Sequence, residues 1–109
     1  MEAVIDQIPT VSESVYPNST STERELARLI HHIVSFIVDD PTSVSVAVDG
    51  REVGGVRCTV YTIKTSKPDA GKVIGKQGRI ILSLREVIKA AAFTRNIKAT
   101  LEVVNYLDQ

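Results

Sequence analysis

The chain has 109 residues, a single cysteine and a formal net charge of zero, which limits it to one small domain and excludes an internal disulfide. No run of about 18 apolar residues is present, so a transmembrane helix is excluded as well. The first residues lack the basic-then-apolar pattern of a secretory signal, and we therefore expect a cytoplasmic protein.

Charge is distributed unevenly along this neutral chain. Residues 1–53 carry nine acidic and three basic side chains, whereas residues 70–98 carry seven basic side chains and one acidic side chain. Positive charge gathered in one segment predicts a local binding site for a polyanion. The neutral total predicts modest affinity for it.

The N-terminal third of the sequence is expected to contain a flexible tail followed by a helix. Residues 1–21 show no sustained hydrophobic period, so we expect a flexible tail at 1–21 and one domain at 22–109. Thr22 and Glu25 have the spacing of a capping box. The adjacent His31 and His32 are expected at the surface, because no further ligand lies at metal-binding spacing. The apolar stripe of this helix consists of Leu26, Leu29, Ile30, Ile33, Val34 and Ile37.

Two strands are predicted next by alternating apolar residues. The first contains Val44, Val46 and Val48, and the second runs from about residue 56 to 65 with Tyr61 and Ile63 on one face. The glycine-rich segment 49–55 between them predicts a hairpin connection longer than the tightest two-residue kind.

The C-terminal half predicts two consecutive helices and a strand. Pro68 and Asp69 indicate the start of a short helix that ends at Ile74 or Gly75. Asn96 is expected to cap the end of the second helix. Apolar and polar residues then alternate over 97–104, which predicts a last strand. The order α-β-β-α-α-β predicts an α+β fold in which three helices cover one face of a three-stranded sheet. The apolar face of the second helix is expected to contain Ile80, Leu84, Val87, Ile88 and Ala91.

The most distinctive segment is residues 71–80, GKVIGKQGRI. Gly75 and Gly78 lack a Cβ, so they can take positive φ and let the backbone approach a ligand closely. A turn that opens onto a helix N-terminus also presents partial positive charge, which suits phosphate. Three cations surround this turn: Lys72, Lys76 and Arg79. The segment therefore predicts a backbone clamp for a polyanion.

This order of elements, with Gly75-Lys76-Gln77-Gly78 between consecutive helices, resembles the type II KH domain. Residues 71–80, followed by Leu84-Arg85 and the alanines at 90–92, are similar to the small single-KH bacterial RNA-binding proteins of the KhpA (YlqC) family. The resemblance covers about residues 22–104. It implies a small RNA chaperone or post-transcriptional regulator that binds single-stranded RNA. It also implies a homodimer or a heterodimer with a KH protein of the KhpB type, away from membranes.

The resemblance further implies that residues 75–78 hold the phosphates and that the bases lie in an apolar groove. The residues it points to are Lys72, Val73, Ile74, Gly75, Lys76, Gln77, Gly78 and Arg79, with Ile63 as a candidate for the groove wall. We expect no catalytic residue, metal or cofactor. A P-loop needs Ser or Thr where Gln77 stands, and the sequence shows no paired carboxylates, nucleophile–base set or metal cluster. The alternative function is a protein-interaction module on the same scaffold, with RNA binding weak or lost.

Leu82 predicts a surface for self-association. A helical wheel places it opposite the expected apolar face of its helix. With Ile81 and Ile74 it is expected to form a small apolar patch that a second copy, or a related KH protein, covers.

Overall fold

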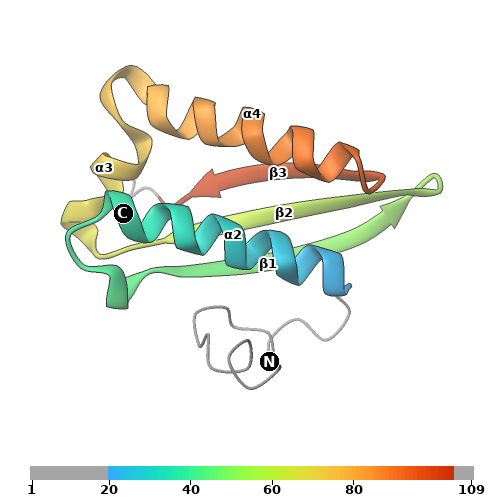
Figure 1. Ribbon diagram of the computed structural model, residues 1–109, viewed down its shortest axis with the longest axis horizontal. Helices are drawn as coiled ribbons and strands as arrows, with labels where there is room; N and C mark the ends of the chain where they lie inside the picture. The colour runs from blue at the N-terminus through green and yellow to red at the C-terminus, as the bar shows by residue number, and fades with distance from the viewer. Residues whose placement is uncertain (1–19, 105–109) are drawn as a thin grey trace.

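The computed structural model describes residues 20–104. Its helices and strands follow in the order α2 (Ser21–Ile37), β1 (Ser45–Val53), β2 (Val56–Lys64), α3 (Ala70–Ile74), α4 (Arg79–Phe93) and β3 (Ile97–Val103) (Figure 1). Single 3-10 turns lie at Pro41–Ser43, Lys67–Asp69 and Lys76–Gly78. Within the described residues, no helix has the length and apolar character of a membrane span.

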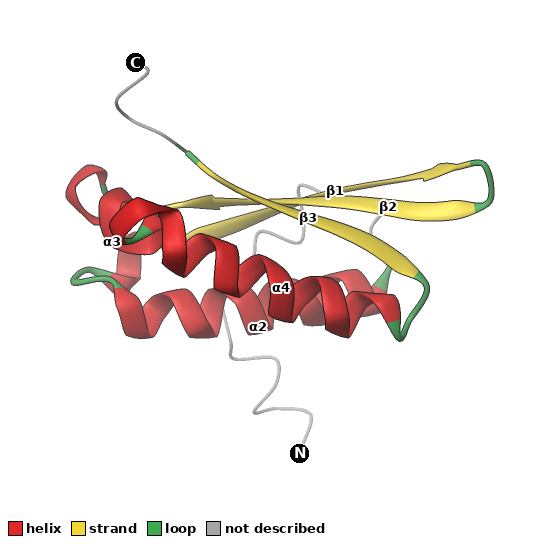
Figure 2. Ribbon diagram, turned by 90° about the horizontal axis from the view of Figure 1, so that it is seen from above, coloured by secondary structure: helices red, strands yellow, loops and turns green. Residues whose placement is uncertain are grey.

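The three strands form one mixed sheet in the order β1-β2-β3. β1 is antiparallel to β2, and β3 runs parallel to β2. Figure 2 shows the helices gathered on one face of this sheet. The arrangement is that of a type II KH fold, and it confirms the α+β class and the element order expected from the sequence.

The core lies between the sheet and the two long helices, because each strand turns alternate side chains toward that layer. Fully buried members from the strands are Val46, Val48, Tyr61, Ile63 and Leu101, and those from α2 are Ala27, Ile30 and Val34. Leu29, which the sequence places in the apolar stripe of α2, is exposed instead.

The face that α4 buries differs from the expected one. Ile81, Leu84, Ile88 and Ala92 are buried, whereas Ile80 and Val87 are exposed. Leu84 and Ile88 were therefore assigned correctly, but the stripe is rotated around the helix axis. The rotation moves Ile81 from the expected dimer patch into the core, so the surface predicted from Leu82, Ile81 and Ile74 does not exist as proposed.

The capping box of α2 uses a different pair from the expected one. Thr20 is the N-cap: its hydroxyl accepts the backbone N–H of Glu23 at 3.1 Å, and the Glu23 carboxylate accepts the backbone N–H of Thr20 at 2.8 Å. The helix thus starts two residues earlier than the Thr22–Glu25 pair predicts, and it includes Ser21 at its first position. The expected tail otherwise falls on residues 1–19, outside the described part of the chain.

The hairpin and His31 also differ from expectation. β1 and β2 pair until Val53 faces Val56, so the connection is only Gly54-Gly55, with φ of 59° and 82°. Two positive-φ glycines form the tightest hairpin turn, and the longer connection predicted from the sequence is wrong. His31 is buried rather than exposed: its Nε2 donates to the Val44 carbonyl at 3.1 Å, which ties α2 to the start of β1.

Candidate nucleic-acid interface

The turn between α3 and α4 has the unusual backbone that the glycines predict. Gly75 takes φ 82° and ψ 173°, and Gly78 takes φ 73° and ψ 16°. Gln77 between them is left-handed as well, at φ 57° and ψ 25°. Three of these four residues take positive φ, which breaks the helix after Ile74 and lets α4 begin directly after the turn.

The two glycines are required for different reasons. A Cβ on Gly75 would lie 2.6 Å from the Ile80 side chain and 2.9 Å from the Ile80 backbone nitrogen, so the first turn of α4 fills that space. A Cβ on Gly78 would meet no described atom within 4 Å. The surface over Gly78 is therefore open, and a ligand backbone can approach it there.

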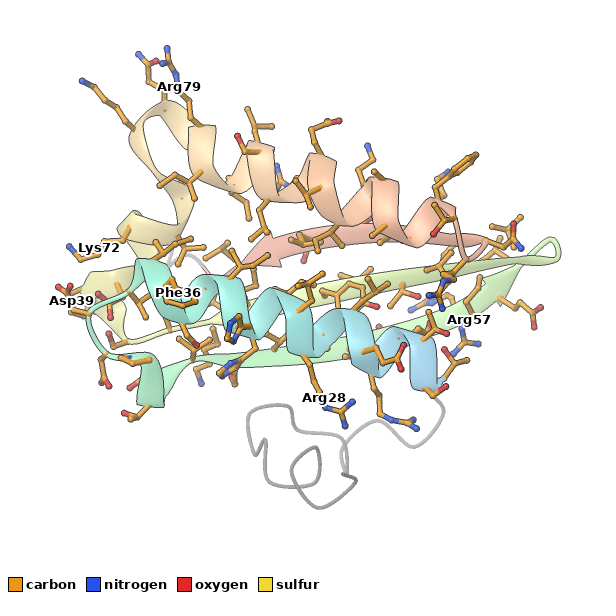
Figure 3. The ribbon with its side chains drawn as sticks, viewed as in Figure 1. Arg28, Phe36, Asp39, Arg57, Lys72 and Arg79 are labelled. Carbon is orange, nitrogen blue, oxygen red and sulfur yellow. The ribbon has the colours of Figure 1, made fainter. Side chains whose placement is uncertain are left out.

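Cations surround this open backbone. Lys76 and Arg79 are exposed, and the Arg79 guanidinium donates to the Gln77 side-chain oxygen at 3.2 Å. Figure 3 shows Arg79 projecting from the turn, away from the body of the molecule. Lys72 lies at the same end, where its ammonium is 3.6 Å from the Asp39 carboxylate. Both partners of that pair are exposed, so the pairing is weak and screened by salt.

Asp69 holds the α2–β1 connection against the start of α3. Its buried carboxylate accepts the backbone N–H groups of Asp39 at 3.2 Å and Asp40 at 3.0 Å, and the Ser66 hydroxyl at 3.0 Å. Burial acts to raise the pKa of Asp69, but these hydrogen bonds outweigh it and the pKa is lowered. The sequence indicated only that Asp69 lies at the start of a helix, because Asp39 and Asp40 are about 30 residues away in the chain.

Two of the expected site residues are fully buried. Val73 and Ile63 are both 0% exposed, so each packs in the core and neither forms a wall that a ligand touches. Ile74 is half-buried beside the turn. Lys72, Ile74, Gly75, Lys76, Gln77, Gly78 and Arg79 thus lie in or beside the turn with some surface exposed, whereas Ile63 and Val73 belong to the buried core.

The described residues contain no group of side chains that could ligate a metal ion. Across residues 20–104 no three His, Cys, Asp or Glu side chains are grouped so that they could hold an ion.

Comparison with known proteins identifies the family to which this chain belongs. The family described as KhpA/KhpB, KH domain, matches residues 27–103. The chain belongs to the KhpA/KhpB KH-domain family. RNA-binding protein KhpA of Clostridium perfringens is 40% identical over 79 residues, which cover 72% of this chain and all of that protein. RNA-binding protein KhpA of Chlamydia caviae is 36% identical over 73 residues, covering 67% of this chain and 88% of that protein.

A solved structure shares the fold. A crystal structure of a variant of Era from Aquifex aeolicus, bound to GDP and AlF4−, superposes with a TM-score of 0.53. The superposition covers 81% of this chain and 33% of Era, at 14% identity. At that identity the likeness concerns the backbone architecture alone. The family assignment of this KH protein rests on the sequence relatives.

Proposed function

We propose that this KhpA/KhpB-family protein binds single-stranded RNA by holding the ribose-phosphate backbone on the turn at residues 75–78. A KH domain clamps about four unpaired nucleotides with such a loop. Its place in the cell would be that of a small RNA chaperone or post-transcriptional regulator.

The observation that carries the proposal is the open space over Gly78. A positive-φ glycine with no neighbour within 4 Å is not needed to avoid an internal clash. Its φ of 73° already favours glycine, and the open space leaves room for another molecule's backbone at the N-terminus of α4, where partial positive charge gathers. Exposed Lys76 and Arg79 flank this position and suit phosphate. The relatives' names, RNA-binding protein KhpA, support the same ligand.

The test is the double variant Lys76→Asp with Gln77→Asp. Two carboxylates then face the phosphate, so binding to a fluorescent single-stranded oligonucleotide, followed by anisotropy, should be lost. Both side chains are exposed, and aspartate tolerates the left-handed backbone at position 77, so the fold should persist.

A charge-matched control is Ser21→Asp with Arg51→Asp, which changes the net charge equally at two exposed positions outside the turn. This control should bind RNA nearly as wild type does. An affinity of the loop variant within about twofold of the control would contradict the clamp.

A second function, contact with another KH protein, is favoured by the groove between α2 and α4. This α2–α4 groove has a volume of about 390 Å³ and is lined by Ile33, Ile37, Arg79, Ile80, Ser83, Leu84 and Val87. Such an apolar surface on the helical layer suits a second copy of this chain or a KH protein of the KhpB type. Because Arg79 lines both the groove and the RNA turn, a partner seated there would compete with RNA.

Val87→Glu tests this interface, since Val87 is exposed and lines the groove. Leu82→Glu is the matched control: Leu82 is exposed on the same helix, but at 3.6 residues per turn it points about 140° away from Val87. Light scattering should show a lower molar mass for Val87→Glu alone. Equal masses for wild type and both variants would contradict an interface in the groove.

A further inference from the structure

A second hollow lies at the opposite end of α4 from the glycine turn. This α4–β3 hollow has a volume of about 630 Å³. The end of α4, the first residues of β3 and the tip of the β1–β2 hairpin meet there, all at one end of the molecule (Figures 1 and 2). Residues that line it include Val56, Lys89, Phe93, Ile97, Lys98 and Ala99.

The α4–β3 hollow exposes apolar side chains that the core leaves uncovered. Phe93 is 80% exposed and Val56 is 47% exposed. Phe93 is held at the end of α4, where the backbone N–H of Asn96 donates to its carbonyl at 3.1 Å. Large apolar groups gathered around a hollow mark a place where a further segment of protein can be buried.

The outer edge of β3 is available beside this hollow. The backbone N–H of Val104 bonds to β2, whereas the carbonyl of Leu101 accepts the Arg85 guanidinium at 3.0 Å. Backbone groups alternate in direction along a strand, so Ile97 and Ala99 face the outer edge as Leu101 does. Because Arg85 occupies the edge at Leu101, an extended segment can add to β3 at Ile97 and Ala99, where the hollow lies.

The hollow is also positively charged. Lys89 and Lys98 line it, both are exposed, and none of the residues that line it carries a carboxylate. An apolar surface flanked by two ammonium groups complements a peptide that combines branched apolar side chains with carboxylates.

The N-terminal residues of this chain have that chemistry. Residues 1–19 carry three carboxylate side chains and neither lysine nor arginine. Within them, residues 4–8 place three branched apolar side chains around Asp6. Residues 1–19 lie outside the described part of the chain and precede the residues 27–103 that match the KH family. Their charge and apolar character make them a fitting occupant of the hollow.

The described chain starts close enough for this segment to reach the hollow. Glu23, in the first turn of α2, binds Arg57, and Arg57 pairs in register with Ile97 at the hollow. Residues 9–19 span at most about 36 Å when extended, at about 3.3 Å per residue. Paired residues of neighbouring strands lie only about 5 Å apart. A connection of this length is therefore ample to bring residues 4–8 around the end of the sheet.

We propose that residues 4–8 of this chain dock in the α4–β3 hollow as an extended strand on the outer edge of β3. Successive side chains of a strand point to opposite faces, so Ile5 packs on Phe93 on the helical side while Asp6 meets Lys98 on the uncovered side. The hollow is then covered by the chain itself and opens only when this segment leaves. The docking does not depend on RNA binding.

A nitroxide label near the start of the full chain tests the docking. Ala3→Cys carries the label, and Cys58→Ser removes the single native thiol. A docked segment brings the unpaired electron close to the hollow, so the backbone amide NMR signals of Phe93 and Lys98 should be lost through broadening. The signal of Gly78 should remain, because it lies about 22 Å away along α4.

Matched substitutions in the labelled chain test each side of the contact. Ile5→Asp should restore the Lys98 signal, because a carboxylate cannot replace the apolar contact with Phe93. Val11→Asp, the same change outside residues 4–8, should leave that signal broadened. On the hollow side, Phe93→Ala should restore the Lys98 signal, and Phe36→Ala should not. Phe36 is the control because it is 82% exposed on α2 and does not line the hollow.

A charge reversal tests the pairing of Asp6 with Lys98. Lys98→Asp in the labelled chain should restore the Phe93 signal, because two carboxylates then face each other. Adding Asp6→Lys should broaden it again, since the opposite charges are restored with their positions exchanged.

The outcomes decide both the site and the occupant. Wild-type signals of Phe93 and Lys98 that stay as sharp as that of Gly78 would overturn the docking. Equal broadening in Ile5→Asp and Val11→Asp would overturn the assignment to residues 4–8. A mixture of isotope-labelled chains with separately spin-labelled chains should show no broadening at the hollow. Broadening in that mixture would mean that the segment of a second copy occupies it, which overturns docking within one chain.

Discussion

Contacts from three residues of β2, namely Arg57, Thr59 and Tyr61, converge on Glu23. Its carboxylate is fully buried, accepts a bidentate pair from Arg57 at 2.8 and 3.1 Å, and also accepts the Thr59 hydroxyl. Gly50 makes room for this carboxylate, because a Cβ there would collide with it. Burial acts to raise the pKa of Glu23, but the hydrogen bonds from Arg57 and Thr59 outweigh it, so the pKa lies below its ordinary value of 4.5.

Glu23→Gln should lower the free energy of unfolding by about 1–3 kcal/mol near neutral pH, because Arg57 and Thr59 lose a charged acceptor. A lowered carboxyl pKa contributes stability in full above the unfolded value of 4.5 and loses it as the pH falls through the folded value. The difference between wild type and Glu23→Gln should therefore shrink below about pH 4.5. Urea unfolding of both proteins at neutral and acid pH measures this difference in the free energy of unfolding.

The control for Glu23→Gln is Asp49→Asn. This variant removes an exposed ion pair with Arg51 at 3.6 Å, and it should change the free energy of unfolding little at either pH. A Glu23→Gln variant as stable as this control at neutral pH would show that the network contributes no net stability.

The two glycines of the turn should respond differently to substitution. Gly75→Ala should lower the thermal midpoint and disrupt RNA binding together, because its Cβ would press on Ile80 at the start of α4. Gly78→Asn should keep the thermal midpoint close to wild type, because asparagine tolerates the left-handed backbone and space is open. It should still weaken RNA binding, by filling the space over the turn. Equal RNA affinity for wild type and Gly78→Asn would contradict a backbone approach there.

At the scale of elements, the α2–β1 connection and α3 act as one unit through Asp69. Asp69→Ala should accelerate hydrogen exchange at the backbone amides of Asp39 and Asp40, which lose their acceptor. It should also weaken RNA binding moderately, since α3 leads into the turn. Asp49→Ala, an exposed strand position, should leave the same two amides protected. Unchanged exchange at Asp39 and Asp40 in Asp69→Ala would show that other contacts hold this connection.

At the scale of the whole molecule, a neutral protein gathers its positive charge along α3, the turn and α4. If Lys72, Lys76 and Arg79 meet phosphates, the log–log salt slope for a bound tetranucleotide should be about −2, at roughly −0.7 per phosphate. Lys72→Gln should flatten the slope by about 0.7, and Arg51→Gln should leave it unchanged. A slope near zero in wild type would mean that recognition does not depend on the phosphate backbone.

Local patterns in the sequence determined the element order, the α+β class and the position of the glycine turn. Alternation identifies a strand, helical spacing identifies a helix, and glycine's freedom at positive φ identifies the turn; each acts within a few residues. These signals suffice for the architecture because none of them depends on what the segment packs against.

Only the tertiary structure decided which of two equivalent local patterns is used. Thr20–Glu23 and Thr22–Glu25 both have capping-box spacing, and Arg57 and Thr59 in β2 select the first by binding Glu23. The buried face of α4 and the burial of Ile63 depend in the same way on which layer covers them. Such choices are made by contacts between residues far apart in the chain, where the free energy of packing outweighs local preference.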